Sequence, residues 1–355
     1  MSKNALFLYT EIADYFLKCV DHFIEQTGAQ VLIVRWPIRD EAPFKLRANN
    51  NVDILEKKDY TFKELEERIH LFQPDLIYTS GWRDRDYLKI NRKYFSKIPT
   101  VLGYDNVWNG SFRQIIASAL SPLYLKKIFS DLWAPGKSQV KFAKKLGFDQ
   151  KHIHLGVYSC NQSYFSEIYS RTKKNRVPGF PRRMIFCARY VKWKGIFELW
   201  QAFKEISQEI PHDWELWCLG TGEEFENRIE YPGIKHFGFV QPNNMEEYLS
   251  QTGVYILPSF FEPWGVTAHE FAAAGFPLIL TKNVGASEKF LIDNHNGFCL
   301  PDCNVAGIKE SMRKIFKLSD AELFRMGEIS NQLSYGITPD TWSITLQRLI
   351  NRNQN

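Results

Sequence analysis

Short apolar runs alternate with amphipathic segments along the first part of the chain. Residues 5–9 and 31–34 are apolar runs of strand length, and between them Phe16, Val20 and Phe23 recur at helical spacing. The same alternation predicts helices over 60–72 and 138–146 and strands over 74–78, 99–104 and 132–135. Strands and helices in this order form parallel sheets covered on both faces, and the ligands of such sheets collect at the carboxyl ends of the strands.

The alternation is lost over residues 160–183, which are polar and basic and contain two prolines, so this stretch is predicted to be a domain junction. It then resumes, with strands predicted over 184–188, 214–219, 234–239, 254–257, 277–280 and 297–300, and helices over 196–206, 245–251, 287–292 and 305–318. We therefore predict two α/β domains, 1–160 and 161–338. A last helix over 339–355 is predicted to cross back to the first domain.

A chain of 355 residues is too long for one ordinary hydrophobic core, which supports two domains. Its 44% of apolar and 24% of charged side chains are typical of a globular protein. The net charge of +5 is modest, and no concentrated basic face predicts a nucleic-acid partner.

No apolar run reaches the roughly 18 residues of a membrane-spanning helix, and the N-terminus lacks the pattern of a signal peptide. We expect a cytoplasmic protein. Its six scattered cysteines are typical of reduced core residues, and Cys299 and Cys303 lack the matching second pair of a zinc site.

A loop and a short helix follow one apolar strand of the second half. Pro263 and Gly265 keep the chain in the loop, and Thr267 and Glu270 have the spacing of a capping box at the start of the helix. Glu262 is then placed in the loop and Glu270 in the first turns of the helix. Two carboxylates are therefore predicted to flank one helix N-terminus.

This arrangement suits a ligand with phosphate in the middle and a sugar at each end. A helix N-terminus carries unsatisfied N–H groups and about half a positive charge, which favours phosphate. Gly265 permits a close approach of the backbone, and carboxylates accept hydrogen bonds from vicinal hydroxyls. The pattern describes a nucleoside diphosphate sugar. The alternative, which is the more common one for an isolated pair of glutamates, assigns Glu270 to a capping box and Glu262 to a solvated loop.

Two cations follow another predicted strand. Arg189 and Lys194 lie between the strand over 184–188 and the next helix, and together they would neutralise a diphosphate without a metal ion. A solvated surface is the alternative for such a run. Asp84 and Asp86 imitate a metal-binding D-x-D motif but lie in the other half of the chain, so no metal is expected.

Several motifs in fixed order carry a family resemblance over residues 184–301. They are Ala188-Arg189, Lys194-Gly195, Leu219-Gly220-Thr221-Gly222, Phe237-Gly238-Phe239-Val240, Pro258-Ser259, Glu262 with Glu270, Ala274-Gly275 with Pro277, and residues 283–288 with Gly285. In this order the chain resembles a retaining GT-B glycosyltransferase of the family-4 type. The resemblance implies two doubly wound Rossmann-like domains facing across a cleft, and closure of that cleft around the substrates.

The resemblance implies a role for each phosphate-side residue. Arg189 and Lys194 would hold the diphosphate and stabilise the departing nucleotide. The backbone at Gly265, Val266 and Thr267 would bind phosphate oxygens, in agreement with the helix-terminus argument. The family mechanism is a front-side substitution in which the phosphate helps to deprotonate the acceptor hydroxyl.

It also implies contacts for the rest of the donor. Glu270 would hold the ribose hydroxyls, and Glu262 would lie against the donor sugar and support the oxocarbenium-like transition state. The strand with Gly238 and the backbone near Val240 would meet the base. No metal or other cofactor is implied beside the nucleotide-sugar substrate.

The N-terminal half matches the family poorly. Where family members carry a histidine, this chain has Asp105, which is interpreted as a ligand for a donor or acceptor hydroxyl. A turn or helix-capping role for Asp105 and Asn106 is the alternative. Acceptors bind mainly to this domain, so the departure leaves the acceptor undefined.

Residues 112–129 form an apolar, amphipathic stretch with Lys126 and Lys127, interrupted by Pro122. One interpretation places the stretch on a membrane surface. The other, which we prefer, is a buried helical hairpin.

The predicted activity is retaining transfer of a sugar from a UDP-linked donor to a saccharide or lipid-linked acceptor, as in the synthesis of cell-surface polysaccharides or glycoconjugates. Peripheral contact with the inner face of the membrane accompanies this prediction. Two alternatives are a nucleotide-sugar epimerase on the same fold and a non-catalytic nucleotide-sugar-binding subunit that needs a partner chain.

Overall fold

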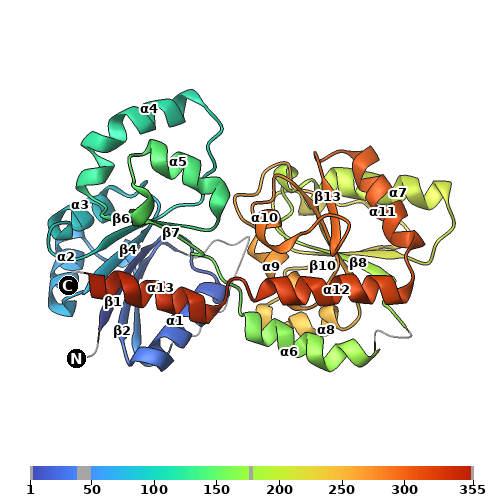
Figure 1. Cartoon of the computed structure of the whole chain (residues 1–355), viewed down its shortest axis with the longest axis horizontal. Coiled ribbons are helices and arrows are strands. Elements are labelled where there is room, and N and C mark those ends of the chain that lie inside the picture. Colours follow the sequence, from blue (N-terminus) through green and yellow to red (C-terminus); the bar gives the residue numbers. More distant parts are fainter. Residues whose placement is uncertain (1–2, 38–48, 176–178, 353–355) are drawn as a thin grey trace. The chain divides into compact units, whose positions relative to one another are not determined.

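The computed structural model describes residues 3–37, 49–175 and 179–352, which form two compact units of alternating strands and helices (Figure 1). Unit 1 holds the described residues through Ser159 together with those from Ile337 onward, and unit 2 runs from Cys160 to Gly336. None of the helices in these ranges combines the length and the apolar character that a bilayer crossing requires.

Within the described residues, unit 1 is built on seven parallel strands in the order β3-β2-β1-β4-β5-β6-β7. The strands are β1 (Asn4–Tyr9), β2 (Gln30–Arg35), β3 (Val52–Glu56), β4 (Leu76–Ser80), β5 (Thr100–Gly103), β6 (Asp131–Ala134) and β7 (Ile153–Leu155). The helices are α1 (Asp14–Thr27), α2 (Phe62–Phe72), α3 (Arg85–Tyr94), α4 (Phe112–Leu120), α5 (Val140–Lys145) and α13 (Pro339–Asn351).

The alternation of side chains along β1 explains why helices cover both faces of this sheet. Ala5, Phe7 and Tyr9 point to one face, where they share a core with α1 and α13. Leu6 and Leu8 point to the other face and pack with α2 and α3. A strand that is apolar on both sides therefore becomes the centre of a parallel sheet.

Helix α13 packs against α1 and forms part of the unit 1 core (Figure 1). The Trp342 ring lies 5.2 Å from the Trp133 ring and 6.1 Å from the Phe7 ring, measured between centroids. Its indole N–H donates a hydrogen bond to the carbonyl oxygen of Val157 at 3.0 Å. The apolar face of the last helix thus covers the centre of the first sheet.

Unit 2 repeats the plan with six parallel strands, counted over the described residues, in the order β10-β9-β8-β11-β12-β13. The strands are β8 (Arg183–Cys187), β9 (Glu215–Leu219), β10 (Ile234–Gly238), β11 (Val254–Leu257), β12 (Leu278–Thr281) and β13 (Gly297–Leu300). The helices are α6 (Gln162–Thr172), α7 (Ile196–Glu209), α8 (Met245–Leu249), α9 (Val266–Ala273), α10 (Ser287–Phe290), α11 (Val305–Lys317) and α12 (Asp320–Ser334).

The predicted loss of regular structure over residues 160–183 is wrong for its first part, which forms α6. Phe165, Ile168 and Tyr169 are buried at helical spacing, but the polar residues between them hide the period. Tyr169 packs on Gly275, where an added Cβ would lie 2.3 Å from the tyrosine ring. Residues 176–178 of the predicted junction lie outside the described residues.

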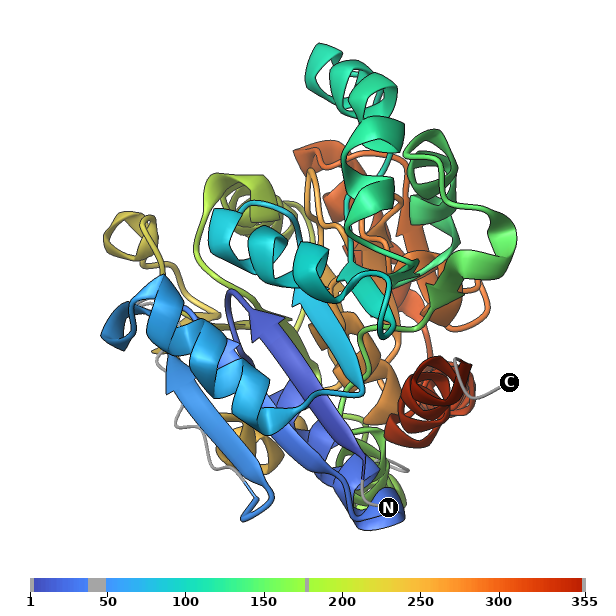
Figure 2. The ribbon, with the colours of Figure 1, turned by 90° about the vertical axis from the view of Figure 1, so that its left-hand side faces the viewer.

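The preferred interpretation of residues 112–129 as a buried hairpin is wrong for α4, although Leu125, Ile128 and Phe129 after it are buried. Helix α4 ends at Leu120, two short 3-10 turns follow it, and no described side chain of α4 is buried. Phe112 is 76% exposed and Leu123 is 69% exposed. Figures 1 and 2 show α4 projecting from unit 1, with no other element of that unit over its outer face. The sequence pattern predicted burial because apolar side chains usually find a covering element.

Candidate functional site

The order of the strands in unit 2 reverses between β8 and β11. After β8 the chain builds outward through β9 and β10, and it then returns to place β11 on the other side of β8. Ligands of doubly wound sheets bind outside the carboxyl ends of the two strands between which the strand order reverses. This topological switch point is therefore the candidate site.

The loops after β8 and β11 are in backbone contact. The N–H of Phe260 donates a hydrogen bond to the carbonyl oxygen of Trp193 at 2.9 Å. Gly195 has a φ of 71°, and a Cβ at this position would lie 2.3 Å from the carbonyl oxygen of Pro258. Only glycine satisfies both conditions without displacing the backbone, so Gly195 allows the two loops to pack together.

This packing joins Lys194 and Glu262 in an ion pair at the switch point. Their side chains are only 14% and 12% exposed. Burial lowers the pKa of Lys194 to about 7, and the charge of nearby Arg189 adds to the lowering. The Cys187 thiol acts in the opposite direction and raises the pKa of Lys194. Lys194 and Glu262 therefore form an ion pair whose two side chains are both largely buried.

Glu270 and Arg189, the two other charged site residues predicted in unit 2, also belong to the region of the Lys194–Glu262 pair. Burial raises the pKa of the Cys187 thiol to about 12, the negative charge of Glu270 raises it further, and the positive charge of Lys194 lowers it. Cys187, at the end of β8, therefore lies within the electrostatic range of both side chains. The guanidinium of Arg189 lies over the Trp193 ring, 6.0 Å from its centroid.

The predicted capping box at the start of α9 is wrong. The helix begins at Val266 with Gly265 as its N-cap, and no side chain caps it. The Thr267 hydroxyl instead forms a hydrogen bond with the hydroxyl of Tyr255 at 2.7 Å. Because Gly265 has a φ of 90°, which side chains rarely adopt, the chain turns into the helix two residues earlier than the capping pattern indicates.

The N-terminus of α9 consequently presents unused donors. The first backbone hydrogen bond at this end runs from the N–H of Ala268 to the carbonyl oxygen of Gly265 at 3.0 Å. Within the part of the chain that the structure describes, the N–H groups of Val266 and Thr267 have no acceptor. A helix of this length with free N–H groups and no side-chain cap is suited to hold an anion.

The loop after β12 fixes Glu262. Glu262 forms a parallel bridge with Val284. Its N–H donates to the carbonyl oxygen of Asn283 at 3.1 Å, and its carbonyl oxygen accepts from the N–H of Gly285 at 3.0 Å. A Cβ on Gly285 would lie 2.2 Å from the carbonyl oxygen of Pro263, so the close approach of the two loops requires glycine there.

The predicted base-pocket residues lie farther along the same sheet edge. Gly238 ends β10, and its carbonyl oxygen accepts a hydrogen bond from the N–H of Gly220 at 2.7 Å. Gly220 follows β9 and packs so closely on Ala188 that an added Cβ would lie 2.0 Å from the Ala188 carbonyl oxygen. Val240 follows two residues after Gly238. The carboxyl edges of β8, β9 and β10 thus form one continuous rim.

Asp105 belongs to unit 1, where it follows β5 at the carboxyl edge of that sheet. The hydroxyl of Tyr158 donates a hydrogen bond to its carboxylate at 3.3 Å. Burial raises the pKa of Asp105, against the lowering effects of Tyr158 and of the nearby charge of Arg83. Asp105 caps none of the helices in the described ranges, so a half-buried carboxyl remains at the mouth of this sheet.

The D-x-D motif has a structural role. Asp84 is the N-cap of α3, and its carboxylate accepts from the N–H groups of Asp86 at 2.9 Å and Tyr87 at 3.1 Å. It also pairs with Lys57 at 2.6 Å. Over the described ranges, no group of three or more His, Cys, Asp or Glu side chains is placed to hold a metal ion.

Sequence reasoning placed Arg189, Lys194, Glu262 and Glu270 at one site but missed the direct pairing of Lys194 with Glu262. It also missed Trp193 and Tyr255, which position a guanidinium and a hydroxyl of the site. The signal for the ion pair was present, since opposite charges follow two different strands. Only the strand order shows that these strands are neighbours.

The class of fold is defined by two units, each built on a parallel sheet, with the candidate site at the switch point of unit 2. The chain aligns over 99% of its length with HepE of Anabaena, solved in complex with UDP and glucose, at a TM-score of 0.73, 12% identity and 100% coverage of that chain. A glycosyltransferase of Rickettsia africae gives a TM-score of 0.72 at 14% identity, with 99% of this chain and 98% of that chain covered. The protein has the GT-B fold, which confirms the predicted fold class.

Residues 170–332 match the family model of glycosyl transferases group 1. An uncharacterized glycosyltransferase of Methanocaldococcus jannaschii is 28% identical over 114 residues, which cover 30% of this chain and 29% of the relative. Glycogen synthase of Mycobacterium tuberculosis is 25% identical over 142 residues (38% and 34%), and 2-deoxystreptamine N-acetyl-D-glucosaminyltransferase of Niallia circulans is 26% identical over 144 residues (38% and 36%). The chain spans about a third of the length of these curated relatives.

Proposed function

We propose that the protein is a retaining glycosyltransferase that moves a sugar from a nucleoside diphosphate sugar to a saccharide or lipid-linked acceptor, with UDP as the nucleotide. The observation that carries the proposal is the convergence of two cations, two carboxylates and an uncapped helix N-terminus at the switch point of unit 2. Phosphate oxygens require the cations and the N–H groups, and sugar hydroxyls require the carboxylates.

In this proposal the diphosphate lies between the two loops. Arg189 binds it through a planar fork of donors, and Lys194 binds it as a point charge. The N–H groups of Val266 and Thr267 donate to phosphate oxygens, and the absence of a side chain at Gly265 permits their close approach. Two cations match the roughly two negative charges of a diphosphate diester, so the site needs no metal to neutralise it.

The carboxylates bind the two sugars. Glu270 accepts hydrogen bonds from the ribose hydroxyls, and Glu262 accepts from the transferred sugar once the diphosphate has drawn Lys194 away. The base lies along the rim at Gly238 and Val240. Glu262 then stands beside the positive charge that develops at the anomeric carbon, where a fixed carboxylate stabilises the transition state.

The chemical step is a substitution at the anomeric carbon. The acceptor hydroxyl oxygen forms a bond to this carbon while the bond to the diphosphate oxygen breaks, and the nucleoside diphosphate leaves with the electron pair. The proton of the acceptor hydroxyl passes to the departing phosphate oxygen. Attack and departure take place on one face of the sugar, so its anomeric configuration is retained. Asp105 of unit 1 binds an acceptor or donor hydroxyl.

The comparisons support the reaction class. The family match over residues 170–332 includes both loops of the candidate site. The structure of HepE holds UDP and glucose, which supports a UDP-linked sugar as the donor.

A direct test incubates the protein with UDP-, GDP- and ADP-sugars, first alone and then with candidate saccharide and lipid-linked acceptors. We expect one donor to raise the unfolding temperature and to yield a glycosylated product whose anomeric configuration, measured by NMR, equals that of the donor. Interconversion of the donor sugar without an acceptor would favour the epimerase alternative. Binding with no transfer to any acceptor would favour a non-catalytic subunit.

The exposed surface of α4 and the turns after it supports a membrane location for the acceptor. We define the α4 patch by its exposed apolar side chains, Phe112, Ile115, Ile116, Leu120, Leu123 and Tyr124. Lys126 and Lys127 follow it directly. Apolar side chains that enter the acyl region beside cations that face anionic headgroups are typical of a helix lying on a membrane surface. We propose that the α4 patch binds the membrane that carries a lipid-linked acceptor.

The double variant Phe112→Glu, Leu123→Glu tests this proposal. We expect it to reduce sedimentation with phosphatidylglycerol vesicles at least about tenfold, because each charge opposes entry into the acyl region. Leu71→Glu is the matched control, since Leu71 is 79% exposed on α2 and lies outside the patch. Equal vesicle binding by the wild type and the double variant would remove the membrane contact from the proposal.

A further inference from the structure

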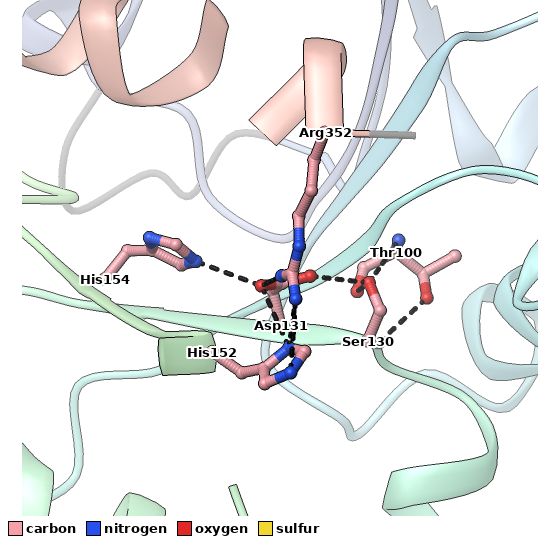
Figure 3. Close-up of polar contacts among 6 residues, drawn as sticks. All are labelled: Thr100, Ser130, Asp131, His152, His154 and Arg352. Atoms are coloured by element: carbon pink, nitrogen blue, oxygen red, sulfur yellow. Dashed lines mark hydrogen bonds and ion pairs between the residues drawn. The ribbon is translucent and has the colours of Figure 1, made fainter. Parts of the chain in front are cut away.

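A network of polar side chains surrounds Asp131 at the amino edge of the unit 1 sheet. Asp131 begins β6, and its side chain is 1% exposed. Its carboxylate accepts from the Ser130 hydroxyl at 2.8 Å, contacts His154 Nε2 at 3.0 Å, and forms an ion pair with Arg352 (Figure 3). Arg352 also contacts the ring of His152 at 3.0 Å. A buried carboxylate thus fixes the orientation of an arginine at the end of the last helix.

The fixed arginine faces a hollow of about 570 Å³ between the segment that leads into β7 and helix α13. Its lining includes Lys151, His154, Thr345, Arg348, Leu349 and Arg352. A second hollow of about 460 Å³ adjoins it and shares Arg348 and Arg352. The described side chains that line the two hollows include no carboxylate. We call the larger hollow with its lining the α13 pocket.

The cations of the α13 pocket exceed its anions. Asp131 compensates Arg352, but within the described ranges no ion pair or hydrogen bond engages the side chain of Lys151 or Arg348. Arginines in the last turn of a helix also complement its dipole, which accounts in part for Arg348 and Arg352. The dipole does not account for Lys151 and His154, which approach the hollow from the opposite side, on a different segment.

We propose that the α13 pocket is a binding site for the phosphoryl group of an anionic ligand. Arg348 can present a planar fork to phosphate oxygens and Lys151 adds a point charge, while Arg352, whose terminal nitrogens contact Asp131 and His152, adds a positive charge in a fixed position before the ligand arrives. The volume lies within the range of small-molecule sites. Phosphorylated metabolites and lipid headgroups share this chemistry.

This site is separate from the acceptor-side region of unit 1. Asp131 begins β6 and Thr100 begins β5, so the network lies at the amino edge of the sheet (Figure 3). Asp105 follows the carboxyl end of β5, at the opposite edge. A ligand of the α13 pocket therefore binds to unit 1 without occupying the place assigned to the acceptor, and the inference does not depend on the proposed glycosyl transfer.

The double variant Lys151→Ala, Arg348→Ala tests the site, with inorganic pyrophosphate as the probe and calorimetry at low salt as the measurement. We expect the wild type to bind pyrophosphate at the α13 pocket and the double variant to bind it there at least about tenfold more weakly, because two charge-assisted contacts are lost. The Lys194→Ala variant removes a cation of the candidate donor site, so pyrophosphate binding that it retains is assigned to the α13 pocket. We expect it to bind pyrophosphate at the α13 pocket as the wild type does. Lys141→Ala is the matched control, because it removes one exposed cation elsewhere on unit 1.

A second measurement distinguishes the two sources of the phosphoryl group. Sedimentation with phosphatidylglycerol and phosphatidylcholine vesicles is compared for the same proteins. If the double variant loses pyrophosphate binding, the ligand is a soluble phosphorylated molecule. If the double variant keeps pyrophosphate binding but sediments less with phosphatidylglycerol vesicles than the wild type does, the ligand is a lipid headgroup. Equal binding of both probes by the wild type and a folded double variant, or binding of neither probe by the wild type, would overturn the proposal.

Discussion

Lys194→Ala is expected to lower kcat/KM for sugar transfer by about 100- to 1,000-fold, the usual cost of removing one group that stabilises developing charge. Two effects combine in this variant. The departing diphosphate loses a buried cation, and Glu262 is left as a buried carboxylate without its ion-pair partner. Steady-state transfer kinetics measure the loss, and circular dichroism establishes that the variant is folded.

Lys192→Ala is the matched control, since it removes the same charge two residues earlier in the chain. The Lys192 side chain is 75% exposed, lies 3.6 Å from a carboxylate oxygen of Glu224, and forms no ion pair or hydrogen bond with Glu262 among the described residues. Its loss should change kcat/KM less than about twofold, because exposed ion pairs contribute little. Comparable losses in the two variants would show that the overall positive charge of the loop matters and that Lys194 has no specific role.

Substitution of the two glutamates is expected to affect different steps, donor binding for Glu270 and the chemical step for Glu262. Glu270→Ala should weaken the binding of UDP alone by about ten- to a hundredfold, because the ribose loses hydrogen bonds to a charged acceptor. Glu262→Ala should leave UDP affinity within about threefold of the wild type while lowering kcat about 100-fold or more, because Glu262 is assigned to the transferred sugar. Calorimetry with UDP and transfer kinetics separate the two effects.

Glu247→Ala serves as the control for both variants, since Glu247 is an exposed carboxylate on α8 and belongs to neither loop of the site. If Glu262→Ala weakened UDP binding as strongly as Glu270→Ala, the assignment of one carboxylate to each sugar would have to be abandoned. Full activity in both variants would exclude the site assignment as a whole.

Much of the fold follows from the sequence because central strands of parallel sheets are apolar on both faces. Such runs, as in β1 and β11, contrast clearly with the amphipathic helices beside them. The failures come from elements whose burial depends on a partner. In α6, the buried residues include the polar Gln162 and Ser166 beside Phe165, Ile168 and Tyr169, so the apolar period is hidden. In α4, the apolar side chains have no covering element in unit 1, and periodicity alone does not distinguish an apolar face that is covered from one that is not.

The sequence predicted the loops of the candidate site, but it did not predict how these loops contact each other. Loops with cations, glutamates and glycines could be placed after strands, but the adjacency of β8 and β11 depends on the strand order of the whole sheet. The prediction of where α9 starts was wrong for a local reason. Thr267 and Glu270 fit a capping box, but the left-handed conformation of Gly265 starts the helix earlier and gives the Thr267 hydroxyl to Tyr255.

The position of α13 has a consequence for the order in which the protein can be completed during synthesis. Unit 2 contains all its strands and helices by Gly336, whereas unit 1 still lacks the last helix, which begins only at Pro339. Until Trp342 has left the ribosome, the parts of Phe7 and Trp133 that contact its ring are uncovered, while α1 already packs on Phe7 through Phe16. The unit made first is therefore finished last, and a chain that stops before α13 exposes the apolar centre of its N-terminal sheet.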